Sequence, residues 1–136
     1  MSHDTPQAAE DAYYDALEEG DLERLMAVWD DSDDIACLLP MQPIARGRNA
    51  VREQFRAVLQ ATTGLNIQTS HLHWLVWEDT AVHLVEETLV GEEGQRSSPV
   101  YASNLYHRGP NGWRMAIHQN APTPPPPGMA PPMARR

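Results

Sequence analysis

The sequence predicts a single α+β domain in which helices gather on one face of a strongly curved, antiparallel sheet. Helical periodicity dominates the first 61 residues, whereas four stretches after residue 64 alternate in the manner of strands. The breaks between these later stretches are short, which favours antiparallel neighbours. At 136 residues the chain can bury one sizeable core but not two.

Two helices are expected near the N-terminus. Thr5 and Pro6 form a typical helix start, and apolar residues then recur at helical spacing as far as Gly20. The acidic residues between them, Glu10 included, are expected to face water. Asp21 caps a second, shorter helix that ends before a run of acidic residues.

A buried strand and a third helix are expected next. Residues 35–39 form an apolar run that stops at Pro40, which is typical of a short buried strand. Residues 43–47 form a turn or a brief second strand. Asn49 then caps a helix over residues 50–61.

Four strands complete the predicted domain. They cover residues 65–78, 80–91, 98–108 and 112–121. Asn111 and Gly112 form a strong hairpin signal between the last two strands. Residues 1–122 are therefore expected to form the domain, and the proline-rich residues 123–136 a disordered tail.

Composition excludes several classes of function. The net charge of -9 argues against nucleic acid or an anionic membrane as a partner. The chain has no lysine, which excludes Schiff-base chemistry and a phosphate-loop lysine. Cys37 is the single cysteine, so no disulfide is implied, and no apolar run is long enough to span a membrane. A cytoplasmic location is expected.

Several stretches of the chain form a recognisable set of motifs. They are Ala12-Tyr13-Tyr14-Asp15-Ala16-Leu17-Glu18-Glu19-Gly20-Asp21-Leu22, Trp29-Asp30-Asp31, Gly47-Arg48-Asn49-Ala50-Val51-Arg52, Asn104-Leu105-Tyr106, Gly112-Trp113-Arg114-Met115 and His118. Over residues 8–121 the chain resembles the SnoaL-like branch of the nuclear transport factor 2-like superfamily, which includes ketosteroid isomerase, scytalone dehydratase and polyketide cyclases. The resemblance implies a cone-shaped, cystatin-like α+β roll with an internal cavity, dimerising through the outer face of its sheet.

Comparison with ketosteroid isomerase argues against that enzyme's own mechanism. The resemblance places Tyr13 at its oxyanion tyrosine and Phe55 at a supporting tyrosine. Its catalytic base would fall near Cys37 or Leu38, where this chain has no carboxylate, and its protonated aspartate would fall at Ser103.

Strand alternation predicts which side chains enter the cavity. If Trp113, Met115 and Ile117 form the outer, dimerising face, then His118 and Asn120 point inward. The same alternation, helped by the family comparison, turns one set of side chains on the two preceding strands inward. These are Leu84, Glu86, Thr88, Ser103 and Leu105.

We therefore expect a pocket for a small, largely hydrophobic molecule. Glu86 or His118 would serve as a general base in an isomerase, cyclase or hydratase, with Tyr13 or Tyr14 and Ser103 as hydrogen-bond donors to an oxyanion. The expected ligand-binding residues are Tyr14, Trp29, Phe55, Leu84, Thr88, Ser103, Leu105 and Asn120.

Two alternatives stay open. Glu86 and His118 could be ordinary hydrogen-bonded core groups, and the domain could be a non-enzymatic dimerisation module. No cofactor or metal is expected, because His71 and His73, which could share a strand face, have no third ligand at a telling spacing.

Overall fold

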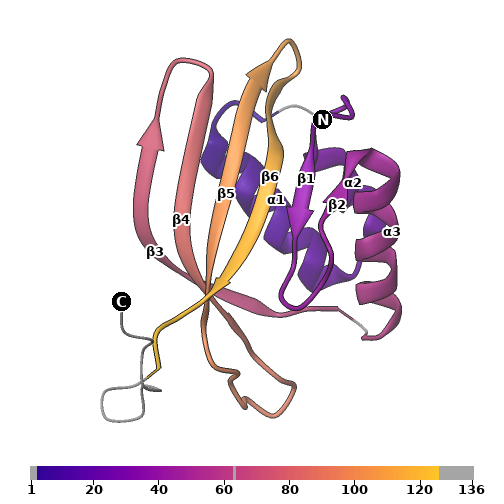
Figure 1. Cartoon of the computed structure of the whole chain (residues 1–136), viewed down its shortest axis with the longest axis vertical. Helices are drawn as coiled ribbons and strands as arrows, with labels where there is room; N and C mark the ends of the chain where they lie inside the picture. The colour runs from indigo at the N-terminus through magenta and orange to yellow at the C-terminus, as the bar shows by residue number, and fades with distance from the viewer. Residues whose placement is uncertain (1–2, 63, 126–136) are drawn as a thin grey trace, which may run out of the picture.

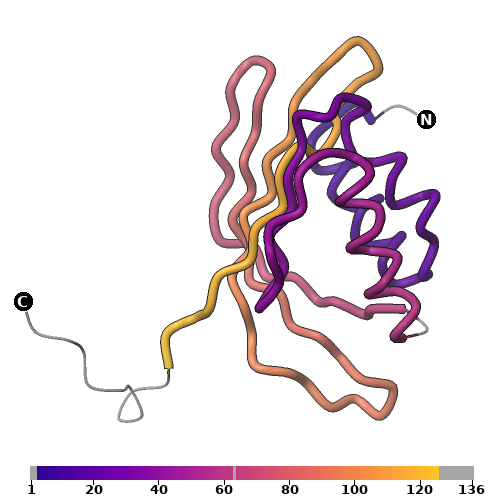
Figure 2. The backbone as a smooth tube through the Cα atoms, turned by 45° about the vertical axis from the view of Figure 1, so that its right-hand side comes forward, coloured from indigo at the N-terminus to yellow at the C-terminus, as the bar shows by residue number. Residues whose placement is uncertain are grey.

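The described part of the chain, residues 3–62 and 64–125, forms three helices and six strands in the computed structural model (Figure 1). The elements are α1 (Pro6–Glu19), α2 (Leu22–Val28), β1 (Ala36–Leu38), β2 (Ala45–Arg46), α3 (Gly47–Gln60), β3 (Ile67–Val76), β4 (Thr80–Leu89), β5 (Val100–Gly109) and β6 (Gly112–Pro122). All three helices lie on the same side of the curved sheet (Figure 2). The α+β prediction is confirmed.

The two N-terminal helices begin and end at the predicted residues. The Thr5 hydroxyl accepts a hydrogen bond from the Ala8 amide at 3.0 Å, which caps α1. Gly20 ends the helix in the left-handed conformation, with φ at 70°. The Asp21 carboxylate then accepts from the Arg24 amide at 3.1 Å and starts α2.

The third helix begins earlier than the sequence predicts. Asn49 does not cap it, because α3 already starts at Gly47. The free amide of Arg48 donates instead to the Asp33 carboxylate at 3.2 Å, so the cap comes from a residue fifteen positions away. This cap is not local, so the residues around the start of α3 do not predict it.

The Arg48 side chain joins the start of α3 to the end of α2. Its guanidinium donates to the backbone carbonyl oxygens of Asp30 at 2.6 Å, Met26 at 3.2 Å and Trp29 at 3.3 Å. These carbonyls belong to the last turn of α2 and to the two residues after it, where backbone acceptors lack helical partners and the helix dipole favours a cation. One arginine therefore fixes two helices relative to each other.

The sheet has the order β2-β1-β6-β5-β4-β3. Strands β3 to β6 form an antiparallel meander, whereas the short β1 pairs in parallel with β6. Leu72 in β3 and Ala116 in β6 are each left out of the pairing and form β-bulges. The first bulge turns His71 and His73 to opposite faces, so the two histidines do not share one.

The second bulge changes which residues of β6 form the core. Trp113 is 6% exposed and Met115 is 0% exposed, and both pack in the core beneath the helices. The prediction that they form an outer, dimerising face is wrong. Ile117, beyond the bulge at Ala116, pairs with Leu105 and lies on the outer side of the sheet.

Two further predictions concern membrane-spanning segments and the C-terminal tail. No helix in residues 3–62 and 64–125 is long and apolar enough to cross a membrane. Of the predicted tail, residues 126–136 lie outside the described residues.

We expect Arg48→Met to lower the free energy of unfolding by about 1–3 kcal/mol, because three carbonyl oxygens lose a charged donor. Arg52→Met is the matched control: Arg52 forms an exposed ion pair with Glu23, which should contribute almost nothing to stability. Urea unfolding of both variants measures the difference. Equal losses would contradict a special role for Arg48.

Candidate functional site

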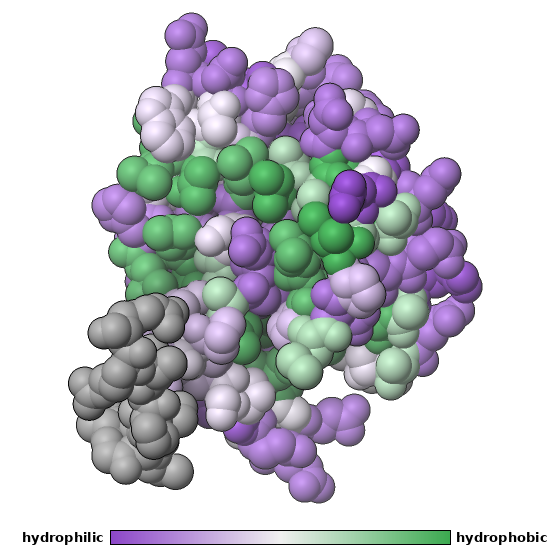
Figure 3. Space-filling view, viewed as in Figure 1, coloured by the Kyte–Doolittle hydropathy of each residue, from purple (hydrophilic) through white to green (hydrophobic). Residues whose placement is uncertain are grey.

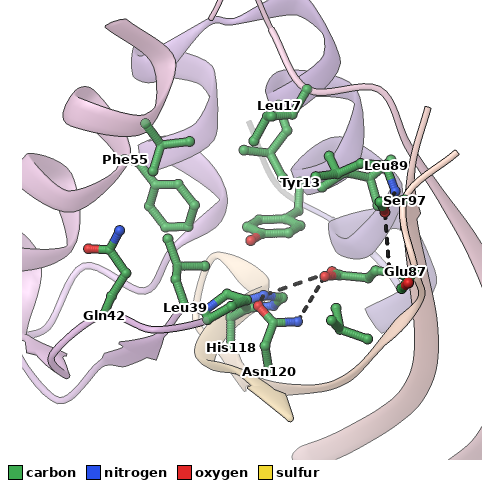
Figure 4. Close-up of a pocket in the computed structure, with 16 residues that line it drawn as sticks. Tyr13, Leu17, Leu39, Gln42, Phe55, Glu87, Leu89, Ser97, His118 and Asn120 are labelled. Atoms are coloured by element: carbon green, nitrogen blue, oxygen red, sulfur yellow. Dashed lines mark hydrogen bonds and ion pairs between the residues drawn. The ribbon is translucent and has the colours of Figure 1, made fainter. Parts of the chain in front are cut away.

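A cavity of about 400 Å³ opens between the helices and the concave face of the sheet (Figure 4). Apolar side chains make up most of its wall, among them Leu17 from α1, Phe55 from α3, Leu39 after β1 and Leu89 at the end of β4. The side chains of Glu87, His118 and Asn120 lie together at one side of it, whereas Gln42 lies at another (Figure 4). A mostly apolar cavity with a few grouped polar atoms is the usual form of a small-molecule site.

Glu87 is the carboxylate at this polar side. It is 7% exposed, and its two oxygens accept hydrogen bonds from the Tyr14 hydroxyl at 2.6 Å and the Asn120 amide at 2.8 Å. The Nε2 atom of His118 lies 3.8 Å from the same carboxylate. A carboxylate is tolerated in an apolar interior when donors saturate it in this way.

A second buried carboxylate, Glu10, lies behind the cavity. It is 3% exposed and accepts hydrogen bonds from the Tyr106 hydroxyl at 2.7 Å and the Asn104 amide at 3.2 Å. His83 Nδ1 lies 2.7 Å from it, and His83 Nε2 lies 2.7 Å from His71 Nδ1. The expectation that Glu10 faces water is therefore wrong.

Tyr13 presents the free donor of the site. Tyr14 and Tyr106 donate their hydroxyls to carboxylates, but no hydrogen bond joins the Tyr13 hydroxyl to another described residue. Its ring packs 6.1 Å from Phe55 and 5.3 Å from His118, measured between ring centroids, and its oxygen is directed into the cavity (Figure 4).

Burial keeps the phenols and the thiol of this region protonated. It raises the pKa of Tyr13, Tyr14 and Tyr106 well above the usual value; the negative charge of Glu10 acts in the same direction on all three, and that of Glu87 on Tyr13 and Tyr14. Burial, helped by the Glu87 charge, raises the pKa of Cys37 to about 12. Tyr13 is therefore a hydrogen-bond donor near neutral pH, and Cys37 is not an activated nucleophile.

The structure brings part of the predicted site together. Tyr13, Phe55, His118 and Asn120 all line the cavity. Tyr14 reaches it only indirectly, through its hydrogen bond to Glu87.

Trp29 does not line the cavity. It is fully buried, and its ring centroid lies 6.4 Å from that of Tyr13 and 6.2 Å from that of Phe55. It therefore supports the two aromatic rings that do line the cavity.

The predicted inward set on β4 and β5 is wrong by one residue. On β4 the buried residues are Ala81, His83, Val85 and Glu87, and on β5 they are Ala102, Asn104 and Tyr106. Leu84, Glu86, Thr88, Ser103 and Leu105 alternate with these and lie on the opposite face. Glu86 thus cannot act in the cavity, and the inward carboxylate is its neighbour Glu87.

The residues of β4 alone do not identify Glu87 as the inward carboxylate. It lies on the same strand face as Ala81 and His83, which carry little apolar surface, whereas the other face of β4 carries Val82 and Leu84. Here the face that carries His83 and Glu87 points inward because these side chains hydrogen-bond to Glu10, Tyr14 and Asn120 on other elements. Among the described residues, no group of three His, Cys, Asp or Glu side chains is arranged to hold a metal ion.

Known proteins share this architecture. The chain matches the model of the SnoaL-like domain family over residues 7–123. A search of curated proteins gave no match.

Solved structures that it resembles include three bacterial proteins. One from Thiobacillus denitrificans, named as a calcium/calmodulin-dependent protein kinase type II association domain, is 35% identical with a TM-score of 0.85, covering 90% of this chain and 98% of the other. An NTF2-like protein from Streptomyces avermitilis, named as a dehydratase, is 28% identical with a TM-score of 0.74, covering 86% and 92%. A Nostoc punctiforme protein of unknown function with a cystatin-like fold is 20% identical with a TM-score of 0.74, covering 93% and 98%.

Glu87→Gln should lower the free energy of unfolding by about 1–3 kcal/mol, because the new amide group points a donor at Tyr14 or Asn120, which already donate. Glu86→Gln, one residue away on the outer face, should change it by less than about 0.5 kcal/mol. Denaturant unfolding of the two variants measures both. A larger loss for Glu86→Gln would mean that the strand faces are assigned the wrong way round.

Proposed function

Because the chain belongs to the SnoaL-like domain family, within the nuclear transport factor 2-like superfamily, we propose that its cavity binds a small, largely hydrophobic molecule. The observation that carries this proposal is the Tyr13 hydroxyl, a donor without a described protein partner at the polar side of an apolar cavity. A buried donor of this kind is best satisfied by an oxygen atom of a ligand.

The lining predicts how such a ligand lies. Its one oxygen acceptor, a carbonyl or hydroxyl, contacts Tyr13, and its apolar body packs between Phe55, Leu39 and Leu89. The cavity of about 400 Å³ suits a molecule of two or three fused or linked rings.

A second candidate function is proton-transfer catalysis on the same ligand, as in an isomerase, cyclase or hydratase. Glu87 takes the place that the sequence prediction gave to Glu86, and its carboxylate lies 3.8 Å from His118 beside the proposed oxygen site. A carboxylate, an imidazole and a phenol around one reacting oxygen are the groups that general acid–base chemistry uses. The pair Glu87 and His118 supports this candidate.

A fluorescent aromatic ketone, 6-propionyl-2-dimethylaminonaphthalene, tests the pocket. Tyr13→Phe should weaken its binding about fivefold to fifteenfold, which corresponds to one hydrogen bond of about 1–1.5 kcal/mol. Tyr101→Phe, on the outer face of β5, is the matched control and should leave binding unchanged. The same affinity in both variants, or no binding to the wild type, would count against the proposal.

The outer face of the sheet supports a second copy of the chain as partner. Apolar side chains gather on this face over the strands (Figure 3). Leu72 and Leu75 on β3 are 46% and 39% exposed, and Leu84, Leu105 and Ile117 lie on the same side of β4, β5 and β6. An uncovered apolar face of this kind is typical of an interface. We propose a homodimer through it, in place of one through Trp113 and Met115.

The dimer proposal predicts a solution mass of twice the 15.2 kDa of one chain by light scattering. Leu105→Glu should yield the monomer, because it puts a charge at the centre of the face. Ile44→Glu, an exposed apolar position outside the face, should leave the mass unchanged. A wild-type mass of one chain would remove the proposal.

A further inference from the structure

His118 lies between two asparagine side chains. Its Nδ1 atom is 2.6 Å from the Oδ1 atom of Asn104, and its Nε2 atom is 3.1 Å from the Oδ1 atom of Asn120. An amide oxygen can only accept a hydrogen bond. The orientation of the two amide groups therefore decides how many protons the imidazole carries.

Asn104 is held in one orientation by its other neighbours. Its Nδ2 atom donates to the Glu10 carboxylate at 3.2 Å and to the Tyr14 hydroxyl at 2.9 Å, and that hydroxyl in turn donates to Glu87. Turning the amide over would place its oxygen against the Glu10 carboxylate, an acceptor facing an acceptor. The Asn104 oxygen must therefore face His118.

Asn120 is held in the same way. Its Nδ2 atom donates to the Glu87 carboxylate at 2.8 Å and to the backbone carbonyl of Tyr101 at 3.0 Å. Both of these partners are pure acceptors, so the amide cannot be turned over without losing both hydrogen bonds. The Asn120 oxygen must also face His118.

From this geometry we propose that His118 is an imidazolium in the resting protein, and that Asn104, Asn120 and Glu10 are positioning residues that keep it so. Both ring nitrogens face acceptors, and only the doubly protonated ring supplies a donor to each. A neutral ring would set one bare ring nitrogen against an amide oxygen, either that of the fully buried Asn104 or that of the half-buried Asn120. Glu87, 3.8 Å away, supplies the balancing negative charge.

The other groups around the ring agree with a cation at this position. Tyr13 packs against it from α1, and Cys37 is its pairing partner on β1. Burial raises the pKa of both groups, so neither carries a charge of its own near neutral pH. The charged groups around His118 are therefore Glu87, from β4, and Glu10, from α1, which reaches it through Asn104 and is itself hydrogen-bonded to His83.

A doubly protonated His118 makes the second candidate function more specific. What it implies for catalysis rests on that proposed function. A ring that already holds two protons donates one rather than accepting one, so His118 would be the acid of a proton transfer and not the base. The proton would leave Nε2, whose hydrogen bond to Asn120 is the longer of the two, and move to the ligand oxygen beside Tyr13.

Nitrogen-detected magnetic resonance of the isotope-labelled full chain tests the proposal directly. Two-bond proton–nitrogen correlations distinguish a doubly protonated imidazole from either neutral tautomer, and the His118 signal is identified by its loss in His118→Gln. At neutral pH and without ligand, the wild type should show both His118 nitrogens protonated. Asn104→Leu should remove the Nδ1 proton, whereas the control Glu86→Gln, which removes an outer-face carboxylate, should leave both protons in place.

A neutral His118 in the wild type would overturn the proposal, even if Asn104→Leu does not fold. Two protonated nitrogens in Asn104→Leu would overturn the role of Asn104. Neither measurement uses a ligand, so both can succeed or fail independently of the aromatic-ketone experiment that tests the pocket.

Discussion

The position of α1 on the sheet depends on a buried hydrogen-bond network that satisfies two carboxylates. Glu10 accepts from donors on β4 and β5, and Tyr14 donates to Glu87 on β4. Each carboxylate would be costly in the core without its donors, so the helix cannot slide or rotate without losing several contacts together. Glu10, Tyr13 and Tyr14 lie on one face of α1. Because the network holds Glu10 and Tyr14 in place, the side chain of Tyr13 between them is directed into the cavity.

Much of the architecture could be predicted because its signals are local. Thr5 and Gly20 mark the ends of α1 through their own backbone neighbours, and Asn111 and Gly112 mark the last hairpin. The start of α3 could not be predicted in this way, because the acceptor that replaces the Asn49 cap is Asp33, before β1. Helices and strands can be predicted from neighbouring residues, except where a side chain distant in the sequence supplies a helix cap.

The candidate site was harder to predict for two physical reasons. Alternation separates a strand into two faces but does not say which one is inside, and here the inner face of β4 carries His83 and Glu87. Glu10 can be buried only because partners 73 and 96 residues away in the sequence, His83 and Tyr106, meet it in the fold. The bulge at Ala116 then reverses the alternation within β6, which no periodicity in the sequence marks.

The two edge strands of the sheet affect how readily the protein aggregates in a crowded solution. One edge strand is β2, which is only two residues long. The other is β3, whose pairing with β4 is interrupted at Leu72. A foreign strand needs a straight row of free amides and carbonyls to pair along its length. Neither edge strand offers a long uninterrupted one, so both are poor templates for the strand addition that leads to fibrils.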